Sequence, residues 1–254
     1  MQIIGFSQSQ DHQQNKPVAL LKFAVMALLA EKAKLLLILF ILWCGYLALG
    51  MLVFTALEGK DEVEEEETKW NHGDSVWFSF VLLTTVGYGD VTPKTGLGKG
   101  LCILYAIFGI PLTILLLRLI GLEMLHSERR LINAIEGRFL RRNRPPHHLH
   151  HKCFLLAILF WLLLLLVGAA VQMLAEDWSY GDSLYFYTIT FMTVGFGDLV
   201  SLARYISVPL TMLGLAAVSN ILHGAASLPL IRRITAGSLR DEEMAEVEEQ
   251  EISV

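Results

Sequence analysis

Residues 85–90 read Thr-Val-Gly-Tyr-Gly-Asp, and residues 193–198 read Thr-Val-Gly-Phe-Gly-Asp. The stretches that precede them also match without a gap: residues 73–78 read Gly-Asp-Ser-Val-Trp-Phe, and residues 181–186 read Gly-Asp-Ser-Leu-Tyr-Phe. Self-similarity of this kind indicates a structural unit that occurs more than once in a chain. The sequence therefore predicts two copies of one unit.

Long apolar segments flank both copies, at residues 35–57, 100–121, 154–174 and 205–230. Each has enough residues, at a rise of about 1.5 Å per residue, to cross about 30 Å of hydrocarbon as a helix. The whole chain is 54% hydrophobic and has a mean hydropathy of +0.51. We therefore expect an all-α membrane protein with four transmembrane helices and two re-entrant pore loops, arranged as span, loop and span, twice over.

Basic residues predict the orientation of these spans. The connector between the second and third spans carries Arg129, Arg130, Arg138, Arg141, Arg142, Arg144 and Lys152, whereas residues 58–67 after the first span are mainly acidic. The connector is therefore expected in the cytoplasm, together with both termini, and the re-entrant loops should enter from outside. The prediction is a multi-pass protein of the cell membrane.

The chain divides into five expected regions. They are a cytoplasmic N-terminus (1–34), a first pore half (35–122), a basic connector (123–152), a second pore half (153–232) and an acidic tail (233–254). Residues 18–30 are apolar but too short to span, which favours an interfacial helix over the alternative of a cleaved signal peptide. Cleavage would place Lys32 and Lys34 outside, against the charge pattern.

Each re-entrant loop should begin with a short pore helix, at residues 75–83 and 183–191. Asp74 or Ser75 would cap the first helix, and Asp182 or Ser183 the second. Non-helical backbone at membrane depth is tolerated only where it is buried in protein or lines a watery cavity. The negative ends of both helix dipoles would favour a cation in such a cavity.

The residues that follow the pore helices predict a filter made of main-chain oxygen atoms. Carbonyl groups in a row can replace the hydration shell of K⁺, and glycines supply the backbone angles that this requires. The expected filter residues are Thr85, Val86, Gly87, Tyr88, Gly89, Thr193, Val194, Gly195, Phe196 and Gly197, with carbonyls from the first four of each set binding K⁺. K⁺ would be the permeant ion, and no other cofactor is expected.

A filter ring of this kind needs four loops, and one chain supplies two. The functional unit should therefore be a homodimer with a pseudo-fourfold pore.

These residues resemble the two-pore-domain potassium channel family over most of residues 35–230. Besides both filter segments, the resemblance includes residues 54–58 (Phe-Thr-Ala-Leu-Glu), 98–102 (Gly-Lys-Gly-Leu-Cys) and 105–112 (Tyr-Ala-Ile-Phe-Gly-Ile-Pro-Leu). It implies a homodimeric leak channel that is gated largely at the filter and helps to set the resting potential. The chain departs from the family where residues 58–72 are too short for the usual extracellular cap and contain no cysteine. Asp90 also stands where some acid-sensitive members carry histidine.

Four further residues are candidates for roles beside the filter. Asp90 and Asp198 could concentrate cations at the outer mouth, and bonding to the pore helix is the alternative. Asn220 and His223 fall three residues apart on the fourth span and could line the inner pore, with His223 sensing internal pH. Packing as a neutral side chain is the alternative for His223.

Partners and alternative functions complete the predictions. Expected partners are a second copy, related subunits in heterodimers, anionic lipids at the basic connector and a PDZ-type domain at residues 252–254, but no nucleic acid. The sequence shows no catalytic constellation and no row of arginines typical of a voltage sensor. Two other functions stay open: a potassium transporter, which would typically carry four repeats, and a non-conducting regulatory subunit.

Overall fold

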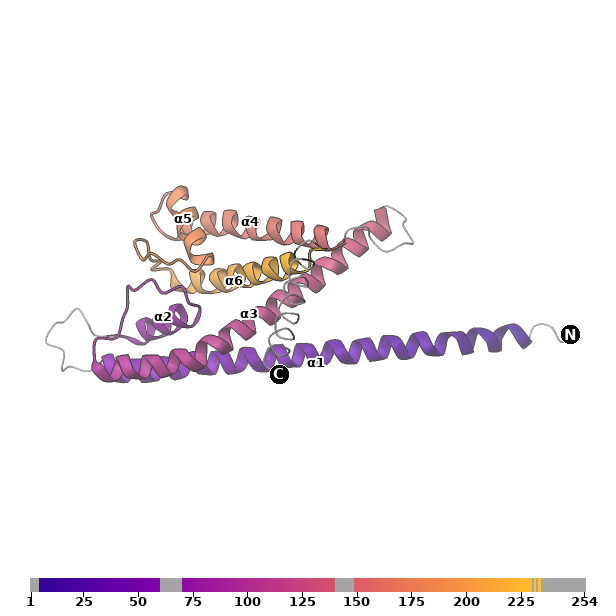
Figure 1. The fold of residues 1–254 in the computed structure, drawn as a ribbon, viewed down its shortest axis with the longest axis horizontal. Coiled ribbons are helices and arrows are strands. Elements are labelled where there is room, and N and C mark those ends of the chain that lie inside the picture. The colour runs from indigo at the N-terminus through magenta and orange to yellow at the C-terminus, as the bar shows by residue number, and fades with distance from the viewer. Residues whose placement is uncertain (1–4, 60–69, 140–148, 230, 232, 234–254) are drawn as a thin grey trace, which may run out of the picture. The chain divides into compact units, whose positions relative to one another are not determined.

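The computed structural model describes residues 5–59, 70–139, 149–229, 231 and 233. These residues form the helices α1 (Gly5–Glu58), α2 (His72–Leu83), α3 (Gly96–Phe139), α4 (Leu149–Ala175), α5 (Tyr180–Phe191) and α6 (Arg204–Ala226), and they contain no strand (Figure 1). The acidic run at 62–67, part of the basic connector and the predicted motif at 252–254 lie outside the described residues.

The chain forms two compact units, residues 1–45 and 46–254. The first unit holds most of α1, which runs as one continuous helix through residues 18–30. The interfacial placement of that stretch stays a prediction. The second unit holds the last turns of α1 and every other helix, including both copies of the repeat.

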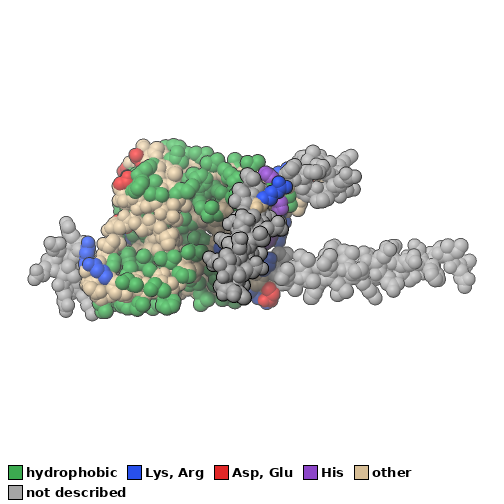
Figure 2. Space-filling view, in the orientation of Figure 1, with side chains coloured by type: hydrophobic (Ala, Val, Ile, Leu, Met, Phe, Trp, Pro, Cys, Tyr) green, Lys and Arg blue, Asp and Glu red, His purple; other side chains and the backbone are tan. Residues whose placement is uncertain are grey.

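Four of the helices are long and apolar enough to cross a membrane: Glu31–Glu58, Gly96–Arg138, Leu149–Ala175 and Arg204–Ala226. The prediction of an all-α protein with four membrane-spanning helices is therefore confirmed. Figure 2 shows hydrophobic side chains over much of the described surface, as a helix facing lipid requires. The fourth span ends at Ala226 rather than at residue 230.

The second span is longer than its apolar run predicts, because α3 continues to Phe139. Leu125 and Ile132, two turns apart on one face, pack against Cys153 of α4. This apolar contact extends the helix through a polar stretch. Part of the expected connector 123–152 is thus helical.

Both pore helices end where the sequence predicts, at Leu83 and Phe191, but they begin three residues earlier. Asn71 caps α2 and accepts from the main chain of Asp74, while the Asp74 carboxylate accepts from the Asn71 main chain. Ser179 caps α5 and accepts from the main chain of Asp182. The predicted caps were therefore wrong, because the aspartates are the returning partners of the cap rather than the cap itself.

Aromatic side chains hold α2 in place within the second unit. Phe54 near the end of α1 packs edge-on against Phe78 of α2 and Tyr105 of α3. Tyr46 and Tyr105 each donate a 2.9 Å hydrogen bond from the hydroxyl to the other residue's carbonyl oxygen. The first pore helix is thereby fixed against both spans of its own half.

Candidate selectivity filter

The chain leaves both pore helices by the same set of main-chain hydrogen bonds. The amides of Val86 and Gly87 both donate to the carbonyl oxygen of Val81, at 3.2 Å each. The amides of Val194 and Gly195 donate to Ile189 in the same way, at 2.8 and 3.3 Å. The two filter segments, residues 85–89 and 193–197, therefore start from equivalent positions.

Backbone angles alternate along each filter segment. φ is positive at Thr85 (59°), Gly87 (62°) and Gly89 (78°), and not at the two residues between them. The second segment repeats this pattern at Thr193 (54°), Gly195 (48°) and Gly197 (76°). Alternation of this kind can turn successive carbonyl groups to one side of the strand.

The positive φ values of Thr85 and Thr193 indicate backbone strain, because each residue has a Cβ atom. They are the only non-glycine residues with a positive φ in the described part of the chain. A left-handed conformation costs roughly 1–2 kcal/mol for such a residue. Strain that occurs twice, at equivalent positions, points to a functional requirement.

The two filter segments lie side by side. A Cβ atom added at Gly195 would lie 2.1 Å from the carbonyl oxygen of Val86, and one at Gly197 would lie 2.2 Å from that of Tyr88. Glycine is therefore required where the second segment passes the first. A Cβ atom added at Gly87 or Gly89, by contrast, meets nothing within 4 Å.

The side chains behind the two segments differ in burial. Val86 and Tyr88 are 3% and 6% exposed, whereas Val194 and Phe196 are 47% and 66% exposed. The ring of Tyr88 stacks between Trp77 and Phe186, at 5.7 and 5.8 Å between centroids. The first segment is thus covered by both pore helices of its own chain.

The aspartates that follow the filters bond to the pore helices. Asp90 accepts a 2.8 Å hydrogen bond from the indole of Trp77, and Asp198 accepts a 3.0 Å hydrogen bond from the hydroxyl of Tyr185. Trp77 and Tyr185 occupy equivalent positions of the repeat. Both aspartates therefore tie the C-terminal end of a filter segment to its own pore helix.

Asn220 and His223, the two candidates for the inner pore, differ in burial. Asn220 is 1% exposed and donates a 2.6 Å hydrogen bond from its side-chain amide to the carboxylate of Glu128 on α3. His223, three residues later, is exposed. The structure thus brings Asn220 to α3 and leaves His223 on the surface of the single chain.

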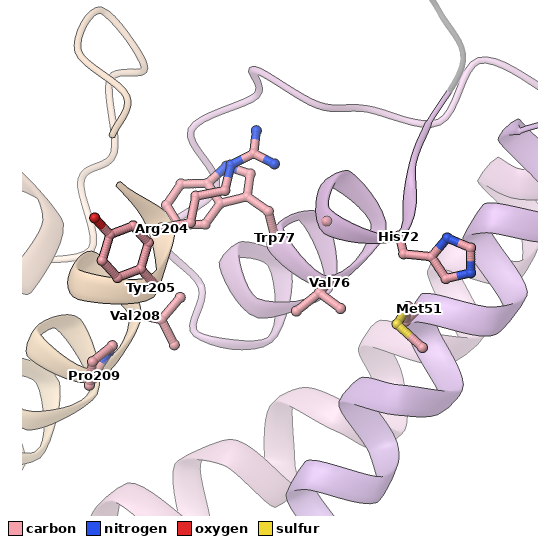
Figure 3. A pocket seen from close by; sticks show the side chains of 9 residues that line it. Met51, His72, Val76, Trp77, Arg204, Tyr205, Val208 and Pro209 are labelled. Carbon is pink, nitrogen blue, oxygen red and sulfur yellow. The ribbon is translucent and has the colours of Figure 1, made fainter. Parts of the chain in front are cut away.

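A pocket of about 460 Å³ lies between α2 and the start of α6, with Met51 of α1 also lining it (Figure 3). Arg204 donates a 2.8 Å hydrogen bond to Asp74 of α2, and its guanidinium lies 5.3 Å from the ring centroid of Trp77. Val208 and Pro209 of α6 add apolar walls. These contacts join the second half of the chain to the first pore helix.

Sequence reasoning missed two acidic side chains near the filter. Glu58, the last residue of α1, accepts hydrogen bonds from Lys94 and Thr95. Glu176, directly after α4, accepts hydrogen bonds from the main chain of Leu202 and Ala203. The sequence did contain an indication of their role, because an acidic residue ends or directly follows each of the two helices, α1 and α4, that precede a pore helix.

Main-chain oxygens are the candidate ligands here. Among the described residues, no group of three or more His, Cys, Asp or Glu side chains could hold a metal ion.

Comparison with known proteins agrees with this architecture. The model of an ion channel family matches residues 35–125 and 156–228, which contain both filter segments. Potassium channel subfamily K member 4 from Mus musculus is 39% identical over 132 residues, which cover 52% of this chain and 33% of that protein. Potassium channel subfamily K member 2 from Homo sapiens is 35% identical over 133 residues, covering 52% of this chain and 31% of that protein.

Potassium channel subfamily K member 5 from Homo sapiens is 34% identical over 134 residues, covering 52% of this chain and 26% of that protein. The chain spans a third or less of the length of these curated relatives. The family model nevertheless covers well over half of the chain, in two blocks that each hold one pore loop. The chain belongs to the ion channel family whose model it matches, and the relatives that it resembles are members of potassium channel subfamily K.

Proposed function

We propose that the chain is one half of a potassium-selective leak channel, and that two copies form one pore in the cell membrane with both termini in the cytoplasm. The observation that carries this proposal is the duplicated filter backbone, with a positive φ at three alternate residues in each copy. Carbonyl groups turned to one side of four such strands would provide successive rings of oxygen atoms for a dehydrated K⁺.

The contacts of the filter glycines support a ring of four strands. Gly195 and Gly197 face the carbonyl groups of the first segment, whereas Gly87 and Gly89 face open space. In a closed ring each strand has a neighbour on both sides. The open side of the first segment is where the second segment of another copy would lie, so that the strands alternate around the pore.

The exposed side chains support the same assembly. Val194 and Phe196 are about half or more exposed in a single chain, while their equivalents Val86 and Tyr88 are buried by the two pore helices. Twofold symmetry would place the first pore helix of the second copy behind Val194 and Phe196. An exposed apolar surface would then become buried, which favours association.

The lack of a voltage sensor in the described spans supports the proposal of a leak channel. They carry no row of arginines on one helix face that could move in response to voltage. K⁺ would then flow down its electrochemical gradient whenever the filter conducts, which draws the membrane toward the K⁺ equilibrium potential. The relatives' names, which describe potassium channels, support K⁺ as the permeant ion.

The test is reconstitution of the full chain in liposomes, with the reversal potential measured under opposed K⁺ and Na⁺ gradients. We expect the current to reverse close to the K⁺ equilibrium potential. A reversal potential near zero under these gradients would contradict selectivity for K⁺. A protein that binds a related channel but passes no current alone would instead be the regulatory subunit that the sequence left open.

A further inference from the structure

Two glutamates hold the loops that lead out of the filters. The Glu58 carboxylate accepts from the main-chain amide of Lys94 at 3.0 Å and from the amide of Thr95 at 3.2 Å. The Thr95 hydroxyl also donates to it, at 2.6 Å. Lys94 and Thr95 come directly before α3, so this carboxylate fixes the far end of the loop that begins at Asp90.

The second copy of the repeat has the same arrangement. One oxygen atom of Glu176, Oε1, accepts from the amides of Leu202 and Ala203 at 2.7 and 3.0 Å. It also accepts from the Ser201 hydroxyl at 2.7 Å and from the Gln172 amide at 3.0 Å. Leu202 and Ala203 come directly before α6, as Lys94 and Thr95 come before α3.

The repeated features are the carboxylate and the two main-chain amides. The side chains at the donor positions differ completely, since Lys94 corresponds to Leu202 and Thr95 to Ala203. Helix stability does not explain the two acids, because a negative charge at the C-terminal end of a helix opposes the helix dipole. What the two copies share is thus a clasp, defined here as Glu58 or Glu176 together with the loop amides that it binds.

Each clasp acts on a filter segment that is also held from the other side. Asp90 is tied to Trp77, and Asp198 to Tyr185. The loop that leaves each filter is therefore fixed at its start by the pore helix and at its end by the outgoing span. A carbonyl ring that must exclude Na⁺ needs its strands held at a fixed separation, or needs a fixed number of ligands.

We propose that Glu58 and Glu176 are positioning residues that set the K⁺ selectivity of the filter by clasping the loops at its outer end. This inference rests on the proposed function, since selectivity has meaning only if the chain conducts. Neither glutamate contacts the ion. They act through residues 90–95 and 198–203.

The two clasps use the carboxylate oxygens differently. Glu58 uses both carboxylate oxygens, because Oε1 accepts from Thr95 and Oε2 accepts from Lys94. Glu176 uses Oε1 for all four donors. Glutamine keeps one oxygen acceptor and replaces the other with a donor. Glutamine should thus preserve both clasps. In Glu176→Gln one oxygen can take all four donors, and in Glu58→Gln the oxygen can accept both loop amides while the NH₂ group donates to the Thr95 hydroxyl. Alanine at either position removes the clasp.

The experiment measures the permeability ratio of Na⁺ to K⁺ from reversal potentials of the full chain in liposomes. We expect Glu58→Ala and Glu176→Ala to raise this ratio about tenfold, because the hydrogen bonds to the loop are lost, and Glu58→Gln and Glu176→Gln, which can keep them, to change it by less than about twofold. Asp177→Asn is the matched control, since it removes the same charge next to Glu176 from an exposed side chain. It should leave the ratio unchanged.

Hydrogen exchange at residues 90–95 and 198–203 separates positioning from folding. Faster exchange in these loops with an unchanged permeability ratio would overturn the proposal and leave the clasps as merely structural. A ratio that rises equally in Asp177→Asn would overturn it in favour of a general charge effect.

If the Glu58 variants do not fold, Thr95→Val removes one donor and Thr95→Ser is its control. A Thr95→Val channel as selective as Thr95→Ser would overturn the proposal.

The wild-type chain separates this inference from the proposed function. A wild type that shows no preference for K⁺ would overturn the proposed function, and the inference with it. A wild type that prefers K⁺, with Glu58→Ala and Glu176→Ala equally selective, would overturn the inference alone.

Discussion

The hydroxyl of Tyr88 lies 2.5 Å from the hydroxyl oxygen of Thr190, which joins the first filter segment to the second pore helix. The two residues are 102 positions apart in the chain, and both are buried. The same helix, α5, supplies Phe186, which stacks on the Tyr88 ring. The second half of the chain therefore holds the first filter, so neither half has a complete filter environment alone.

The bond between Tyr88 and Thr190 should contribute to both stability and selectivity. Tyr88→Phe leaves the buried Thr190 hydroxyl without this partner, which should cost about 1–3 kcal/mol of unfolding free energy. Thr190→Val should cost a similar amount, and the double variant should cost less than the two single variants together. Thermal unfolding of the purified protein in K⁺ measures these differences.

Thr188→Val is the control for that cycle, because the Thr188 hydroxyl bonds within its own helix, to the carbonyl oxygen of Leu184. It should show no coupling to Tyr88→Phe. Additive effects of Tyr88→Phe and Thr190→Val would contradict a direct bond.

Alanine substitutions at filter glycines should distinguish one chain from an assembled pore. Gly195→Ala places a Cβ atom against the carbonyl oxygen of Val86, at a residue with positive φ, and should abolish K⁺ current. Gly87→Ala meets nothing within 4 Å in a single chain. The positive φ of Gly87 (62°) strains an alanine in any case, so the dimer is the deciding measurement: if a second copy closes the ring, Gly87→Ala should weaken dimers seen by native mass spectrometry as well as reduce current.

Gly96→Ala serves as a control outside the filter, since a Cβ atom there also meets nothing within 4 Å and φ is not positive. It should conduct normally. Dimers of Gly87→Ala as abundant as those of the wild type, with normal current, would show that no strand lies beside the first segment.

The sequence allowed most of the fold to be predicted, and its failures have physical reasons. Four apolar runs and a duplicated motif predict the spans and both pore helix ends, because hydrophobic length and filter chemistry are local properties. The extension of α3 was missed because Leu125 and Ile132 have an apolar partner only once α4 packs beside them. Contacts between distant segments leave no local pattern.

The candidate site divides in the same way. The filter residues follow from a short motif, whereas Asn220 was grouped with His223 from helical spacing alone. Its contact is Glu128, which lies 92 residues earlier in the chain and is buried. Nothing in the sequence near either residue indicates that pairing. Glu58 and Glu176 were missed because the partners that the two copies share are main-chain amides, which any residue supplies.

Asp90 and Asp198 should raise the cation concentration at the outer mouth as well as bonding to the pore helices. Replacing both with asparagine keeps an oxygen acceptor for Trp77 and Tyr185 but removes two charges per chain. We expect lower single-channel K⁺ current at low ionic strength. At high ionic strength we expect little change, because salt screens the carboxylate charges and their field becomes short-ranged. Single-channel recording at several salt concentrations measures this.

Trp77→Phe gives the complementary result, since it removes the indole donor to Asp90 and keeps the charge. It should reduce thermal stability without changing the salt dependence of the current. A double asparagine variant with wild-type current at low salt would leave the aspartates with only their bonds to the pore helices.

The contact between Asn220 and Glu128 should stabilise the packing of α6 on α3. Asn220→Leu leaves a buried carboxylate without its donor and should destabilise the protein by about 1–3 kcal/mol or more. Replacing both residues with leucine should recover much of that loss, because no unpaired polar group remains. Thermal unfolding of the single and double variants decides this, and a double variant less stable than Asn220→Leu would contradict it.

The central claim is that each chain supplies two of the four strands around one pore, and mixing two kinds of subunit tests it most directly. Wild-type chains are co-expressed with an equal amount of non-conducting Gly195→Ala chains, and the remaining K⁺ current is measured per channel protein. If any Gly195→Ala chain blocks its pore, random pairing into dimers leaves about a quarter of the current. About half would indicate one chain per pore, and about one-sixteenth would indicate four chains per pore. Either of those results would contradict the account.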